Sequence, residues 1–178
     1  LRAAVERLLI TIGGAVRMNA GGRCGNLGDI VRSVHVLGDD GVDEAWSHER
    51  LGFSYRHSAL GNRTVLSARL ALVEADPIRT QAAFDEYFEQ KKRTQPLAEH
   101  SAGCIFKNPE GHSAGALIDR AGLKGTCSGQ ARVSERHANF IVADRGATSS
   151  DVLRLIDLIR ERIFKDFGTT LETEIDIW

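Results

Sequence analysis

The chain has 178 residues, of which 42% are hydrophobic and 26% are charged, and its formal net charge is -1 at pH 7. This composition is typical of a globular protein with one domain or two small ones, and the interspersed charges argue against binding to nucleic acid or to a membrane surface. Because the sequence contains neither an apolar run of membrane-spanning length nor a signal peptide, we expect a cytoplasmic protein.

The first part of the chain is expected to be mainly antiparallel sheet. Residues 1–10 have apolar positions at helical spacing. Residues 30–37 are rich in β-branched side chains, and the turn residues 38–41 precede an alternating stretch at 42–46, so a β-hairpin is predicted. Residues 64–74 alternate too, which predicts a further strand with one apolar face formed by Leu66, Ala68, Leu70 and Leu72.

A helix is predicted to begin the second part of the chain. Asp76 and Pro77 have the residue types of an N-cap and a first helical position, and the apolar stripe after them reaches about Lys92. We therefore place a domain boundary between residues 76 and 77, giving domains 1–76 and 77–178.

The rest of the second part alternates between helices and strands. Ser113 is a candidate cap for a short helix that stops at Gly122, and residues 133–143 are predicted to form one strand. The clearest helix starts at a capping-box pattern, Thr148 with Asp151, and ends at Gly168. The alternation in 170–177 predicts a final strand, with Glu174 on its polar face.

The cysteines and histidines do not form a metal-binding pattern. Cys24, Cys104 and Cys127 show no Cys-x-x-Cys spacing, and no two of the six histidines are four residues apart. Three cysteines cannot all pair within one chain. These patterns argue against a disulfide framework and against a zinc site, so we expect no metal.

Three motifs are candidates for a functional site. The small residues of 13–22 would let backbone amides approach a flat or anionic ligand, although a glycine-rich bend in a sheet would have the same composition. Residues 51–58 place Arg56 beside Tyr55 in a loop, where an arginine is most often a surface residue. Residues 103–109 contain Cys104, and a single cysteine in a loop is more often buried and inert than reactive.

Taken together, in this order and spacing, the three motifs resemble the UDP-N-acetylenolpyruvoylglucosamine reductase family. The resemblance continues in further segments, namely 93–97, 117–125, 133–140 and 167–175. It implies an α+β protein in which residues 1–76 form the second, mainly antiparallel lobe of a VAO/PCMH-type FAD-binding domain. An α/β substrate-binding domain would occupy 77–178, and the N-terminal lobe of the FAD-binding domain would be missing.

The resemblance also implies a reaction. NADPH would reduce FAD, and the reduced flavin would deliver hydride to the enolpyruvyl ether of UDP-N-acetylglucosamine, giving UDP-N-acetylmuramate for peptidoglycan synthesis. Arg56 would stabilise the enolate, since a guanidinium stays charged and offers paired donors. Glu174 would donate a hydrogen bond to it, which requires a raised pKa.

Cys104 would supply the proton at a position where the family more commonly has a serine. A thiol is a stronger acid than an aliphatic hydroxyl and, at an ordinary pKa of about 8.5, it is mostly protonated at neutral pH. The alternative is that Cys104 marks a degenerate copy that has lost its catalytic group.

The remaining implied contacts fall into two sets. The expected substrate-binding residues are Tyr55, Gln95, Lys107, Asn108 and His137. The expected flavin-binding residues are Gly13, Gly14, Asn19, Ala20 and Gly21. A rival hypothesis is a truncated, non-catalytic domain that binds a sugar nucleotide or another protein.

Overall fold

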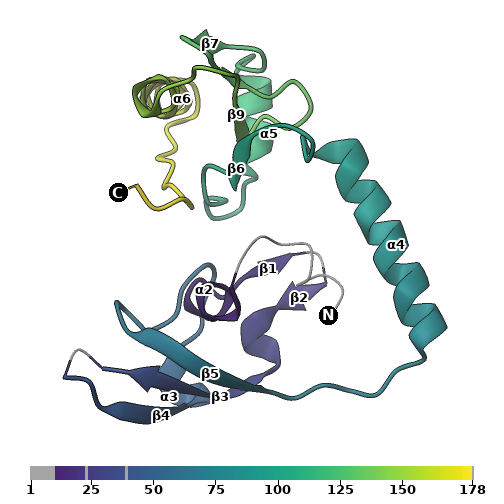
Figure 1. Ribbon diagram of the computed structural model, residues 1–178. Coiled ribbons are helices and arrows are strands. Elements are labelled where there is room, and N and C mark those ends of the chain that lie inside the picture. Colours follow the sequence, from purple (N-terminus) through teal and green to yellow (C-terminus); the bar gives the residue numbers. More distant parts are fainter. Residues whose placement is uncertain (1–10, 23, 39, 178) are drawn as a thin grey trace. The chain divides into compact units, whose positions relative to one another are not determined.

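The structure is a computed structural model that describes residues 11–22, 24–38 and 40–177 (Figure 1). The helix expected at 1–10 lies outside the described residues. The chain divides into two compact units, Leu1–Phe84 and Asp85–Trp178, and this division falls within the helix α4 (Pro77–Thr94). A functional domain boundary after residue 76 stays a prediction. All strand pairs among the described residues are antiparallel, so the α+β class with antiparallel sheets is confirmed.

The first unit is built on a three-stranded sheet in the order β4-β3-β5. Its strands are β3 (Val31–Leu37), β4 (Asp43–Ser47) and β5 (Thr64–Leu70). The predicted hairpin is confirmed, since Leu37 pairs with Asp43 and the N–H of Gly38 donates to the carbonyl of Val42 at 2.9 Å.

Shorter elements complete this unit. They are α2 (Ile12–Arg17), β1 (Gly21–Gly22), β2 (Gly25–Asn26), the 3-10 turn η1 (Leu27–Asp29) and α3 (His48–Leu51). The core of the unit is formed where α2 and α3 pack with the sheet, and its fully buried members include Val16, Val31, Val34 and Leu51.

The predicted apolar face of β5 is partly wrong. His35 pairs with Ser67 and Val36 with Val65, so Leu66 is an extra residue in β5, a β-bulge. A bulge shifts the alternation of side chains by one position. Val65 therefore packs against the core, together with Ala68 and Leu70, whereas Leu66 is 51% exposed. Regular pairing ends at Leu70, before the predicted end at residue 74.

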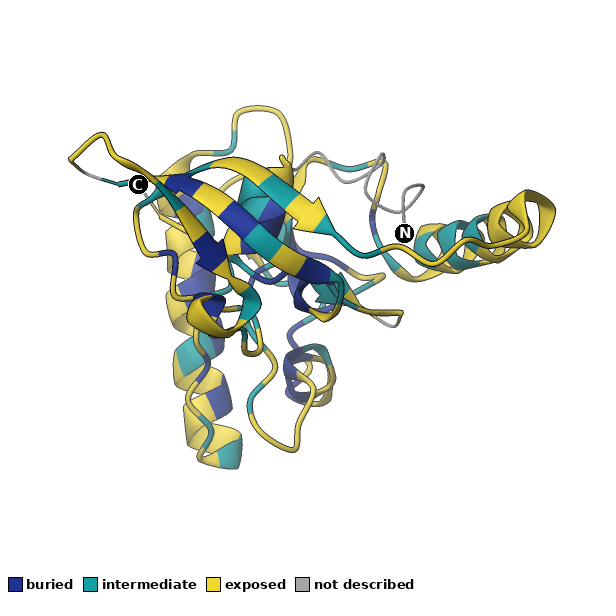
Figure 2. Cartoon of the chain, turned by 90° about the horizontal axis from the view of Figure 1, so that it is seen from below, coloured by how far each residue is buried: buried dark blue, intermediate teal, exposed yellow. Residues whose placement is uncertain are grey.

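The helix α4 has the predicted start. The carboxylate of Asp76 accepts a hydrogen bond from the N–H of Arg79 at 2.8 Å, as an N-cap residue does. None of the residues of α4 is buried, and the helix accordingly shows no dark blue in Figure 2. Its predicted stripe of Phe84, Tyr87 and Phe88 is half-buried. None of the described helices combines the length and the apolar character needed to cross a membrane.

The second unit has a four-stranded sheet in the order β6-β9-β8-β7. The strands are β6 (Ser101–Cys104), β7 (Cys127–Ser128), β8 (Ala131–Val133) and β9 (Phe140–Ala143), and the helices are α5 (Ala114–Arg120) and α6 (Ser149–Phe167). The core includes four residues of one face of α6, namely Leu155, Ile156, Ile159 and Ile163.

The predicted ends of α6 are confirmed. Thr148 and Asp151 form both hydrogen bonds of a capping box. Gly168 follows the helix with φ 66, a left-handed conformation that glycine adopts at low cost. The prediction for α5 is confirmed as well, since the hydroxyl of Ser113 accepts the N–H of Ala116 at 3.3 Å.

Two strand predictions in this unit are wrong. Residues 133–143 are not one strand: Val133 ends β8, residues 134–139 form a turn in which the N–H of Phe140 donates to the carbonyl of His137 at 3.0 Å, and β9 begins at Phe140. The expected strand at 170–177 is an irregular segment with one β-bridge, between Phe106 and Thr173. Its alternating sequence pairs with only a short stretch of the loop after β6, so a regular ladder does not develop.

Candidate active site

The glycine-rich segment of the first unit begins as a helix, so the alternative of a bend in a sheet does not hold for Ile12–Arg17. Thr11 caps this helix by accepting the N–H of Gly14 at 3.1 Å. A Cβ atom on Gly13 would lie 3.3 Å from Cβ of Val65, and one on Gly21 would lie 2.1 Å from Oδ1 of Asn26. Packing within the unit therefore accounts for glycine at both positions.

Asn19 joins the glycine-rich segment to two other parts of the first unit. Its side chain is 5% exposed. The amide nitrogen donates to the carbonyl of Ser54 and the amide oxygen accepts the N–H of Gly28, both at 2.8 Å. Both ends of the side chain are thus engaged in holding the fold.

Arg56 belongs to the same hydrogen-bonded assembly. Ser54 and His57 exchange two backbone hydrogen bonds around it, and its φ of 53 is left-handed. Its guanidinium donates to the carbonyl of Gly21 at 3.0 Å and lies 5.2 Å from the ring of Tyr55, which is 50% exposed. The motifs at 13–22 and 51–58, separate in the sequence, therefore form one surface of the first unit.

The cysteine motif of the second unit leaves the sheet at the end of β6. Cys104 pairs with Phe140 of β9 and is half-buried. The residues after it turn inward, since Ile105 and Phe106 are buried in the core. Cys104 therefore lies at the junction between an edge strand and a loop that is anchored by its buried side chains.

The C-terminal segment binds to this loop. The N–H of Glu174 donates to the carbonyl of Ile105 at 2.7 Å, and the N–H of Lys107 donates to the carbonyl of Glu172 at 2.9 Å. The ammonium of Lys107 also lies 3.4 Å from the carboxylate of Glu172. The main chain of Glu174 is thereby held beside the residue that follows Cys104.

Asn108 and His137 flank the start of α5. The side-chain oxygen of Asn108 accepts the N–H of Ala114 at 3.0 Å, so part of its amide serves as a second cap of this short helix. The ring of His137 lies edge-on to Phe140, with 4.8 Å between the centroids. A Cβ atom on Gly115 would lie 3.2 Å from the ring of His137, so glycine at this position leaves room for the ring.

The surroundings of His137 favour its neutral form. Its Nδ1 atom lies 3.3 Å from the N–H of Asn139, an arrangement in which Nδ1 accepts the hydrogen bond. Burial lowers the pKa of the imidazole, and the positive charge of Lys124 lowers it further. With Nδ1 as the acceptor, Nε2 carries the proton, so the ring can offer one donor to a ligand.

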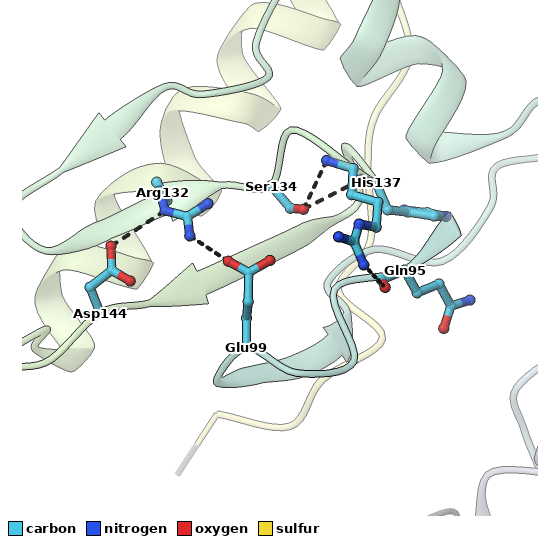
Figure 3. A network of polar contacts seen from close by, with 7 residues as sticks. Gln95, Glu99, Arg132, Ser134, His137 and Asp144 are labelled. Carbon is cyan, nitrogen blue, oxygen red and sulfur yellow. Dashed lines mark hydrogen bonds and ion pairs between the residues drawn. The ribbon is translucent and has the colours of Figure 1, made fainter. Parts of the chain in front are cut away.

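Gln95 lies beside an arginine-rich network (Figure 3). Arg136 donates to the main-chain carbonyls of Lys92 and Gln95, at 3.0 and 3.3 Å, and so caps the C-terminal end of α4. Arg132 bonds to Glu99 and, at 3.3 Å, to Asp144. Sequence reasoning missed the roles of these two arginines and of Asn139, because each role depends on partners far along the chain.

The expected site residues are thus distributed over both units. The five expected flavin contacts, Tyr55 and Arg56 lie in the first unit. The second unit contains Gln95, Cys104, Lys107, Asn108, His137 and Glu174. Within residues 11–22, 24–38 and 40–177, no group of three metal-binding side chains is placed to hold an ion.

Known proteins resemble the whole chain. The family model described as "UDP-N-acetylenolpyruvoylglucosamine reductase, C-terminal domain" matches residues 95–178. Relatives named UDP-N-acetylenolpyruvoylglucosamine reductase include those of Moorella thermoacetica, 42% identical over 169 residues, and Synechococcus elongatus, 43% identical over 172 residues. Each match covers 94% of this chain and 56% of the relative, so the chain spans a little over half of their length.

A solved structure is similar over almost the same extent. The crystal structure of UDP-N-acetylenolpyruvylglucosamine reductase from Thermus caldophilus superposes with a TM-score of 0.86 at 39% sequence identity. The match covers 99% of this chain and 63% of that chain. Sequence and fold therefore indicate the same relationship.

Proposed function

Because the chain belongs to the UDP-N-acetylenolpyruvoylglucosamine reductase family, we propose that it takes part in the reduction of UDP-N-acetylglucosamine enolpyruvate to UDP-N-acetylmuramate. The hydride would come from NADPH through FAD. Residues 1–76 would be the second lobe of a VAO/PCMH-type FAD-binding domain, and residues 77–178 the substrate-binding domain. The proposal includes the cytoplasmic location that the sequence suggests.

One observation carries the proposal beyond family membership. The hydrogen bond of 2.7 Å between the N–H of Glu174 and the carbonyl of Ile105 joins the segment of one expected catalytic residue to the loop of another, Cys104. These residues are 70 positions apart, and their proximity is what a shared site requires.

The residues expected at the flavin offer it a packing surface. The amide of Asn19, the N–H of Gly14 and the carbonyl of Gly21 already have partners within the unit. Gly13, Gly14, Ala20 and Gly21 are half-buried and small, so they can contact a flat ring by van der Waals packing.

When bound, FAD would supply a hydride acceptor and donor between NADPH and the vinyl carbon of the substrate. Arg56 would bind the carboxylate on which negative charge develops, and it would stabilise that charge more strongly in the transition state than in the ground state. Cys104 would hold the proton that the adjacent carbon receives. Glu174 would donate a hydrogen bond to the enolate, for which its carboxyl must be protonated.

Two cysteine variants test this assignment in the FAD-loaded protein that carries this chain. In anaerobic stopped-flow experiments, Cys104→Ala is expected to leave flavin reduction by NADPH unchanged and to block flavin reoxidation by the substrate. Cys104→Ser should reoxidise, because a hydroxyl can take over the proton transfer. Cys127→Ala, at an exposed cysteine, is the control. Unimpaired reoxidation in Cys104→Ala would remove the thiol from the mechanism.

A further inference from the structure

Asn139 is a buried polar residue to which neither the sequence motifs nor the proposed chemistry gives a role. It lies in the turn between β8 and β9, and it is 3% exposed. Its side-chain oxygen accepts the N–H of Phe106 at 3.0 Å, and its side-chain nitrogen donates to the carbonyl of Phe106 at 2.8 Å. Its own carbonyl accepts the N–H of Ile105 at 2.9 Å. One residue thus satisfies three backbone groups of the loop that follows Cys104.

The loop is held on its other side by the C-terminal segment. There the carbonyl of Ile105 and the N–H of Lys107 bond to Glu174 and Glu172. The main chain at 105–107 is therefore bonded on both sides, as a strand inside a sheet would be. On one side, however, the amide side chain of Asn139 takes the place of a neighbouring strand.

We infer that Asn139 is a positioning residue that fixes the loop carrying Cys104 and Lys107 in its binding geometry. The catalytic meaning of this inference rests on the proposed function, but the anchoring does not. A primary amide suits the task, because its donor and its acceptor match the C=O and N–H of a single residue. A carboxylate can serve only the N–H, and a leucine of similar size serves neither group.

Asn139→Asp and Asn139→Leu separate these contributions. An unsatisfied buried backbone group costs enough to raise local opening about tenfold or more. Amide hydrogen exchange, followed residue by residue in the full 178-residue chain, should therefore show at least about a tenfold loss of protection at Phe106 in both variants. Protection in α6 should be unchanged. Asn62→Asp, at an exposed asparagine of the first unit, is the matched control.

Lowering the pH provides a rescue that only one variant can show. A protonated carboxyl has both a donor and an acceptor, so the protection of Phe106 in Asn139→Asp should recover in acid after correction for intrinsic exchange rates. Asn139→Leu should not recover. Unchanged protection of Phe106 in both variants would overturn the inference. An equal loss of protection in α6 would overturn it too, because Asn139 would then support the whole unit rather than the loop.

A kinetic measurement connects the loop to the reaction. In the FAD-loaded protein, Asn139→Asp at neutral pH is expected to slow flavin reoxidation by the substrate at least tenfold while leaving reduction by NADPH unchanged. Equal reoxidation rates in wild type and variant would overturn the catalytic part of the inference. If the wild-type protein does not reoxidise with this substrate, the proposed function fails, and the exchange experiment still decides whether Asn139 holds the loop.

Discussion

Replacing Asn19 by alanine should weaken the surface that joins the two motifs of the first unit. The amide of Asn19 connects Ser54, which lies two residues before Arg56, to Gly28 of η1. Alanine removes both hydrogen bonds and leaves the N–H of Gly28 buried without its acceptor. It also places an ordinary side chain at a φ of 46, which asparagine tolerates better than alanine.

The structure allows the loss of stability to be estimated. The orphaned N–H of Gly28 costs about 1–3 kcal/mol because Gly28 is buried, whereas the carbonyl of the exposed Ser54 can be hydrated at a cost of about 1 kcal/mol. The left-handed backbone adds about 1 kcal/mol. We expect Asn19→Ala to lower the free energy of unfolding of the first unit by about 3–5 kcal/mol. Asn19→Gly should lose about 1 kcal/mol less, since glycine relieves only the backbone strain.

Urea unfolding followed by tryptophan fluorescence measures this loss. The chain has two tryptophans, so a Trp178→Phe background leaves the buried Trp46 of β4 as the only reporter. Asn62→Ala, at an exposed asparagine of the same unit, controls for the substitution itself. If Asn19→Ala and Asn62→Ala unfold at the same urea concentration, the two hydrogen bonds do not hold the unit together.

Three further predictions concern the second unit. Burial, together with the charge of Lys124, lowers the pKa of His137. The contribution of His137 to stability is therefore fully present above the ordinary pKa of about 6.5 and is lost as the pH falls below that value. His137→Gln should flatten this part of a plot of stability against pH, and an unchanged slope would contradict the assignment. Thr148→Ala should cost about 1 kcal/mol in thermal unfolding while Thr148→Ser stays close to wild type, and equal losses would exclude the capping role. Ile159→Ala, at a buried position of α6, should cost about 2–5 kcal/mol by chemical denaturation, and a loss no larger than that of the more exposed Leu158→Ala would contradict the packing.

Elements with local signals could be predicted from the sequence. The capping box at Thr148 and the glycine at 168 depend on neighbours within a few residues, so both ends of α6 were predicted correctly. The hairpin of β3 and β4 was predicted for the same reason. The bulge at Leu66 could not be predicted from the sequence. It exists only in the pairing of β5 with β3, and the residues of β3 lie about thirty positions away in the sequence.

The candidate site can likewise be predicted from the sequence only where its features depend on neighbouring residues. Cys104, Arg56 and Glu174 were proposed from motifs that resemble a family, but their surroundings depend on contacts that no motif contains. Asn139 reaches Phe106 across 33 residues, and Asn19 reaches Ser54 across 35. A buried asparagine has no periodicity to reveal it, and its partners are backbone groups that every residue carries.

The anchoring of the loop also bears on an exchange of cysteine and serine at position 104. The bonds that fix the loop come from the main chain of Ile105, Phe106 and Lys107, so they are indifferent to the side chain at position 104. Cys104→Ser should therefore alter the acidity and size of the side chain proposed as the proton donor while leaving the path of the loop unchanged. It follows that Cys104→Ser, which keeps a donor in place, should still reoxidise, whereas Asn139→Asp should slow reoxidation because it shifts the loop.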